Sequence, residues 1–174
     1  MRLRKPFRRT LPVPPEVMAR AGLHQGETLL AWAPSGERLW LLGTHTALHV
    51  VGEDSRRIPW ETVERADWNR DDELLVVTEV GEFGRVRPRH ELHLDEPRRL
   101  LELVRERVTA SVVLQRRVPV RGSQGLLVVG RRSPAGDDEV SWSYEFDEGV
   151  DPEDPAVMAA AEAGLASARG ELGL

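Results

Sequence analysis

Short apolar runs follow one another between residues 28 and 94, and turn-forming residues such as Pro34-Ser35-Gly36 and Gly52-Glu53-Asp54 separate them. Runs of this length, bounded by Gly, Pro, Asn and Asp, are typical of β-strands joined as antiparallel hairpins. The pattern therefore predicts seven strands, at Thr28–Ala33, Arg38–Gly43, Ala47–Val51, Arg56–Trp60, Val63–Asn69, Glu73–Val80 and Arg85–Leu94.

The spacing of the apolar positions changes after Asp95, which is placed to cap a helix. Leu100, Val104 and Val108 recur at helical spacing, while charged residues fall mainly between them. We therefore expect an amphipathic helix that extends to about Leu114, with one face on the sheet and the other in water.

Strand patterns return in the last third of the chain, at Val118–Arg121, Gly125–Arg131 and Glu139–Phe146. In the last of these, apolar and polar residues alternate most clearly, which predicts a strand with one buried face. Asp154 followed by Pro155 is a typical helix start and predicts a helix to about Glu171.

These elements define an α+β chain in three parts. Residues 1–25 are expected to form a basic arm and a short helical lead-in, because prolines interrupt the first fifteen residues. Residues 26–114 form a β domain with a capping helix. Residues 115–174 form a β-hairpin and a C-terminal helix that pack on that domain.

Composition narrows the classes of function. The chain has 174 residues, no cysteine and a net charge of −5, so disulfides, thiolate catalysis and cysteine-ligated metals are excluded. No apolar stretch approaches the roughly 20 residues that span a bilayer. Pro12, Pro14 and Pro15 interrupt the segment in which a signal peptide needs an unbroken apolar run. We expect an unprocessed cytoplasmic protein, and the excess of arginine over lysine is typical of a GC-rich genome.

The strand pattern resembles the pleckstrin-homology-like superfamily, and in particular an uncharacterised actinobacterial branch of it. The segments that carry this resemblance are Gly26–Ala33, Trp40–Thr44, Ile58–Val63 and Leu74–Val77. The resemblance implies a seven-stranded antiparallel sandwich or barrel that a helix caps, followed here by a strand–strand–helix extension. Phosphoinositide-binding members carry basic residues in the first hairpin loop, where this chain has Pro34-Ser35-Gly36-Glu37-Arg38, and their capping helix usually contains a tryptophan, which residues 97–114 lack.

No catalytic, cofactor-binding or metal-binding site is predicted. His45 and His49 are four residues apart, but in a strand this separates them by roughly 13 Å. His90 and His93 would point to opposite faces of their strand. No Gly-x-Ser-x-Gly motif and no EF-hand register is present, so we do not expect an enzyme.

The predicted function is that of a non-catalytic adaptor that binds another protein. The candidate partner-binding residues are Trp60, Trp68, Val157, Ala161 and Leu165. The last three belong to a stripe of mainly small residues that packs either on the domain itself or on another chain, a second copy included. The stripe consists of Val157, Ala160, Ala161, Gly164, Leu165 and Ala168. As an alternative function, the basic arm binds an anionic membrane or nucleic acid through Arg2, Arg4, Lys5, Arg8 and Arg9.

Overall fold

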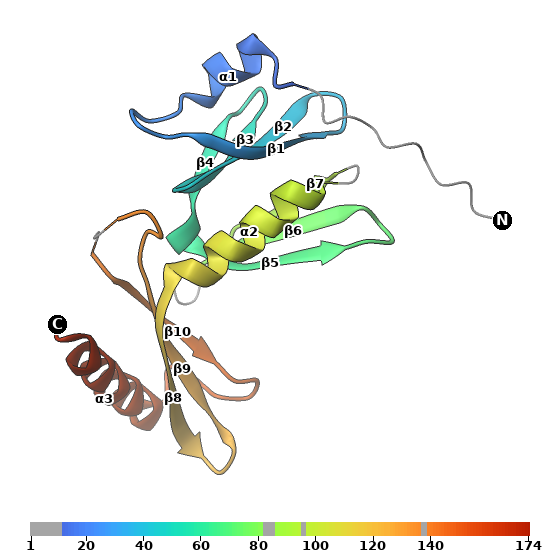
Figure 1. Ribbon diagram of the computed structural model, residues 1–174. Coiled ribbons are helices and arrows are strands. Elements are labelled where there is room, and N and C mark those ends of the chain that lie inside the picture. The colour runs from blue at the N-terminus through green and yellow to red at the C-terminus, as the bar shows by residue number, and fades with distance from the viewer. Residues whose placement is uncertain (1–11, 82–85, 95–96, 137–138) are drawn as a thin grey trace.

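The computed structural model describes residues 12–81, 86–94, 97–136 and 139–174, and this part of the chain contains three antiparallel sheets and three α-helices (Figure 1). The α+β class expected from the sequence is confirmed. The described strands form three separate sheets and no closed barrel.

The N-terminal lobe, residues 12–111, contains two meanders. Helix α1 (Pro15–Ala21) precedes the first sheet, whose strands lie in chain order. That sheet contains β1 (Leu29–Ser35), β2 (Leu39–Thr44), β3 (Ala47–Val51) and β4 (Arg56–Pro59). A short 3₁₀ helix, η1 (Trp60–Thr62), leads into the second sheet, which contains β5 (Val63–Asn69), β6 (Leu74–Glu79) and β7 (Arg89–His93).

Helix α2 (Arg98–Ser111) packs against β1 and β5 and covers the core between the two sheets. Leu100 and Val104 point into this core as the helical spacing predicts. Gly43 allows α2 to lie close to β2, because a Cβ at that position would be only 2.5 Å from Cδ2 of Leu103. Core packing of this kind leaves no room for an added methyl group.

At two places the structure has a different type of element from the one that the sequence predicts. Helix α2 ends at Ser111 and β8 begins at Val112, so the expected helix is three residues too long. The cause is the run Val112-Val113-Leu114, in which two β-branched residues favour a strand. Trp60, expected in a strand, begins η1 instead.

The C-terminal lobe, residues 112–174, contains three strands, which correspond to the three strand patterns in this part of the sequence and form a sheet larger than the simple β-hairpin expected for residues 115–174. They are β8 (Val112–Arg121), β9 (Gln124–Arg131) and β10 (Ser141–Phe146), in the spatial order β10-β9-β8. Strand β8 begins at Val112, before the expected start at Val118, and is therefore longer than predicted. Helix α3 (Pro155–Leu172) packs on β8 and β9, and its N-cap Asp154 accepts a 2.8 Å hydrogen bond from the amide of Ala156, as predicted (Figure 1).

Arg131 joins the two lobes. Its side chain is 4% exposed and donates to the backbone oxygen of Glu64 in β5 at 3.4 Å and to Oγ of Ser143 in β10 at 3.2 Å. Burial raises the pKa of Glu64, and the guanidinium of Arg87, 2.7 Å away, opposes this increase. Within the described ranges, no helix is long and apolar enough to cross a bilayer.

Candidate functional site

The candidate site is a partly exposed apolar surface in the C-terminal lobe, formed by the aromatic row of β10 and one flank of α3. We call it the β10–α3 surface and define it by Trp142, Tyr144, Phe146, Met158, Leu165 and Leu172. It arises because α3 covers β8 and β9 but leaves β10 largely uncovered by a helix.

The strand register places the three aromatic side chains of β10 on one face of the sheet. Trp142, Tyr144 and Phe146 alternate with polar residues, so all three share the face of the sheet on which α3 lies. Trp142 lies over Gly130, where an added Cβ would be 2.9 Å from its ring. The rings of Tyr144 and Phe146 have centroids 6.1 Å apart and are tilted by 52°. Each of the three side chains is only partly buried.

Helix α3 presents two neighbouring stripes. Val157, Ala161, Gly164 and Ala168 are buried against the sheet, and a Cβ on Gly164 would lie 2.4 Å from Cγ2 of Val118. The small residues thus bring α3 close to β8 and β9.

The second stripe, Met158, Leu165 and Leu172, repeats every seven residues and lies on the adjacent flank. Met158 and Leu172 are each 37% exposed, and Leu165 is partly buried. This flank is the part of the β10–α3 surface that the helix contributes.

Glu162 and Arg169, which carry opposite charges, lie close to Tyr144. Burial raises the pKa of Tyr144, the carboxylate of Glu162 raises it further, and the guanidinium of Arg169 lowers it. Both charges are therefore within electrostatic reach of Tyr144, on the β10 side of α3. On the other side of the helix, Glu171 pairs with Arg116 of β8. The apolar side chains of the β10–α3 surface are thus accompanied by the carboxylate of Glu162 and the guanidinium of Arg169.

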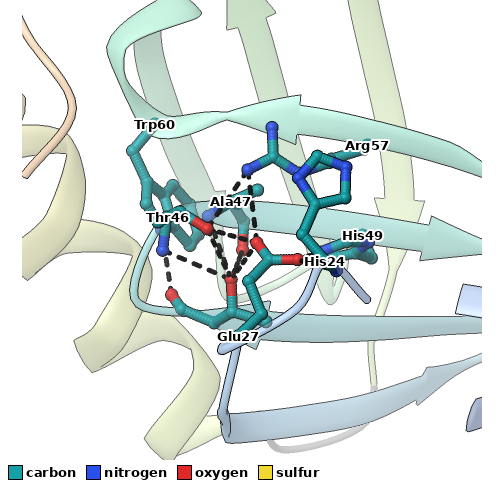
Figure 2. A network of polar contacts seen from close by, with 8 residues as sticks. His24, Glu27, Thr46, Ala47, His49, Arg57 and Trp60 are labelled. Carbon is teal, nitrogen blue, oxygen red and sulfur yellow. Dashed lines mark hydrogen bonds and ion pairs between the residues drawn. The ribbon is translucent and has the colours of Figure 1, made fainter. Parts of the chain in front are cut away.

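A buried polar network is the second organised cluster, and it lies in the N-terminal lobe (Figure 2). The side chain of Glu27 is 4% exposed and accepts hydrogen bonds from the hydroxyls of Thr46 and Thr44, the second at 3.1 Å. The amide of His24 donates to it at 2.8 Å, and Arg57 pairs with it at 3.2 Å. The network ties the segment between α1 and β1 to β2, β3 and β4.

The charges in this network are set by its donors. Burial alone would raise the pKa of Glu27, but the donors from Thr46, His24 and Thr44, with the charge of Arg57, lower it to about 2. Burial lowers the pKa of His49, whose Nε2 lies 3.5 Å from the Glu27 carboxylate and has no hydrogen bond among the described residues. Glu27 is therefore a fixed negative charge at neutral pH.

The predicted partner-binding residues separate into two groups. Trp60 is fully buried and donates from its indole nitrogen to the backbone oxygen of Thr44 at 3.0 Å, which corrects its prediction as a binding-surface residue. Trp68 packs partly buried against the core of the N-terminal lobe. Val157 and Ala161 are buried in their own lobe, whereas Leu165 is partly buried and belongs to the β10–α3 surface.

The predicted polyanion-binding residues Arg2, Arg4, Lys5, Arg8 and Arg9 lie outside the described residues. Met158 and Leu172 were not predicted from the sequence, although their seven-residue spacing around Leu165 was a usable signal. Within the ranges that the structure describes, no three His, Asp or Glu side chains lie close enough together to hold a metal ion. Comparison of the chain with protein-family models, with curated proteins and with solved structures returned no match.

Proposed function

We propose that this chain is a non-catalytic protein-interaction module that binds an amphipathic helix on the β10–α3 surface. The observation that carries the proposal is the meeting of two apolar rows on one partly exposed surface. One row is Trp142, Tyr144 and Phe146 on β10, and the other is Met158, Leu165 and Leu172 on α3. Surfaces that combine aromatic residues and Met are typical of interfaces.

The dimensions of the lobe favour a helix as the ligand. Strands lie about 4.8 Å apart, so three strands present a face about 14 Å wide, whereas one helix with its side chains is about 10 Å across. Helix α3 therefore covers two strands, and β10 remains beside it. A partner helix at the usual interaxial distance of about 9 Å from α3 would lie over the aromatic row and complete the helical layer.

The N-terminal lobe is proposed to be a pleckstrin-homology-like scaffold for this site. In support, a four-stranded meander and a three-stranded meander precede α2, which packs on β1 and β5. Folds of this class carry many different binding functions, so the proposal rests on the β10–α3 surface and not on the fold.

Arg131, buried between the lobes, would hold the β10–α3 surface in a fixed position relative to the N-terminal lobe.

Site-specific photo-crosslinking tests the proposed function in the cells from which the chain comes. Tyr144, the only tyrosine, is replaced by photoreactive benzoylphenylalanine, which carries a benzoyl group in place of the tyrosine hydroxyl. A matched control places the same residue at Leu30, which is 42% exposed in the N-terminal lobe. Irradiation is expected to give a discrete protein adduct from position 144 and none from position 30.

The result contradicts the proposal if position 144 gives no adduct, or if both positions give the same diffuse products. Peptide mass spectrometry of the adduct then shows whether the crosslinked partner segment is helical in pattern, with apolar residues at i, i+3 or i+4 and i+7. A partner segment without that periodicity would reject the helix as ligand.

A further inference from the structure

The two lobes have separate hydrophobic cores. The buried apolar residues of one core all lie within residues 31–108, and those of the other all lie within residues 114–168. Each of the three sheets also belongs to a single lobe. The chain passes between the lobes once, where α2 ends at Ser111 and β8 begins at Val112 (Figure 1). Each lobe is therefore stabilised by its own core, and one covalent connection joins the two.

The hydrogen bonds that Arg131 makes at the junction are long. Its Nη2 donates to the backbone oxygen of Glu64 in β5 at 3.4 Å and to Oε1 of Glu145 in β10 at 3.4 Å, beyond the usual range for such bonds. Its Nε has no hydrogen-bond partner among the described residues, although the side chain is buried. A buried donor without a partner costs free energy that hydration recovers. The closed junction is therefore held only weakly by this side chain.

A narrow cleft separates the lobes beside Arg131. Glu64 and Arg87 line it from the N-terminal lobe, and Ser143, Tyr144 and Glu145 line it from β10. Glu64 and Arg87 pair with each other at 2.7 Å on their own side of the cleft, so this ion pair survives if the lobes move apart. Because these lining side chains are charged or polar, opening the cleft exposes little apolar surface and loses little hydrophobic stabilisation.

The pivot of such a movement lies where the chain crosses. The amide of Arg132 donates to the backbone oxygen of Ser111 at 2.8 Å, and this bond persists during a rotation because it lies at the crossing itself. The pairing of β8 with β9 shifts register between Val112 and Leu114. Irregular pairing of this kind marks places where a strand bends.

We propose that the lobe junction is a hinge, about which the C-terminal lobe turns as a rigid body when Arg131 releases β5. Contacts between domains permit such motion unless they are large and apolar, and hinges are commonly a few residues at the ends of elements. Arg131 acts as the latch of the closed arrangement. In the open arrangement the β10–α3 surface faces in a different direction relative to the N-terminal lobe. The hinge does not depend on what that surface binds.

Distance measurement between two spin labels tests the hinge in the full chain. The chain has no cysteine, so Asp71→Cys in the β5–β6 turn and Ser123→Cys in the β8–β9 turn provide the only two labelling sites, one in each lobe. Pulsed electron paramagnetic resonance is expected to show a second interlobe distance besides that of the closed junction. Arg131→Met should increase the population at the second distance by about tenfold or more, since it removes hydrogen bonds made by a charged group.

The control pair is Asp71→Cys with Glu37→Cys, which places both labels on exposed turns of the N-terminal lobe. Its distance should be the same with and without Arg131→Met. Ser143→Ala is a milder change, because it removes only the 3.2 Å bond from Nη1 of Arg131. It should increase the population at the second interlobe distance by roughly threefold.

The proposal is supported if Arg131→Met populates a second interlobe distance while the control distance stays unchanged. It is overturned if the interlobe distribution is as narrow as the control distribution in the natural chain and in both variants. If Arg131→Met broadens both pairs alike, the chain has lost its fold, and Ser143→Ala decides: an interlobe distribution unchanged in that variant overturns the hinge.

Discussion

Replacing Glu27 with Gln measures how much the buried polar network contributes to folding. The carboxylate is nearly inaccessible to water and accepts hydrogen bonds from two threonines and a backbone amide. The natural glutamate has its pKa lowered from 4.5 to about 2, which stabilises the folded state by about 3 kcal/mol at neutral pH. Glu27→Gln removes that charge, leaves Arg57 without its counterion, and should lower the free energy of unfolding by about this amount.

The pH dependence gives a sharper result than the mutation at a single pH. Because the folded-state pKa is lower than the unfolded-state pKa, the stabilisation is fully present above the unfolded value of 4.5 and is lost as the pH falls toward about 2. Between pH 7 and pH 3.5 the natural chain should lose about 1.4 kcal/mol from this group, whereas Glu27→Gln should lose nothing from it. The stability difference between the two proteins should narrow accordingly.

The assay is urea unfolding at several pH values, followed by the intrinsic fluorescence of the five tryptophans. One of them, Trp60, lies beside the network and donates to the backbone oxygen of Thr44. Glu53→Gln, at an exposed position between β3 and β4, serves as the matched control and should shift the unfolding midpoint little. A difference between the natural chain and Glu27→Gln that stays constant from pH 7 to pH 3.5 would refute the reasoning about the Glu27 charge.

Three further changes have signs that the structure fixes. Gly164→Ala should destabilise the chain by about 1–3 kcal/mol, because its Cβ would lie 2.4 Å from Val118, whereas Gly170→Ala in the same helix meets nothing within 4 Å and should stabilise by up to about 1 kcal/mol. Denaturant titration of the two variants checks the opposite signs. Asp154→Ala removes the N-cap of α3 and should cost about 1 kcal/mol by the same titration. Arg131→Met should separate the lobes, which limited proteolysis near the α2–β8 junction would detect as faster cleavage; equal cleavage rates would show that this arginine does not hold the lobes together.

The regular elements were largely predictable because their signals are local. The start of α3 follows from Asp154 and Pro155, and the alternation in β10 follows from Trp142, Tyr144 and Phe146. The end of α2 was misplaced because Val112 fits both the helical spacing and a strand, and packing against β9 decides in favour of the strand. Local patterns do not decide such competitions.

The polar network could not be predicted from neighbouring residues. Glu27, Thr46 and Arg57 lie far apart in the sequence, and only the pairing of β3 with β4 places His49 opposite Arg57 beside them. The β10–α3 surface could be predicted from the sequence only in part. The small-residue stripe on α3 was found, but it proved to be the buried one. The stripe of Met158, Leu165 and Leu172 required the position of α3 on the sheet to be known.

Fluorine NMR of the chain labelled with 3-fluorotyrosine tests the central claim most directly, since Tyr144 is the only tyrosine and belongs to the proposed binding surface. The account predicts that its single resonance shifts when the partner segment that crosslinks to position 144 is added as a synthetic peptide. A resonance that stays unchanged at saturating peptide would contradict helix binding at the β10–α3 surface.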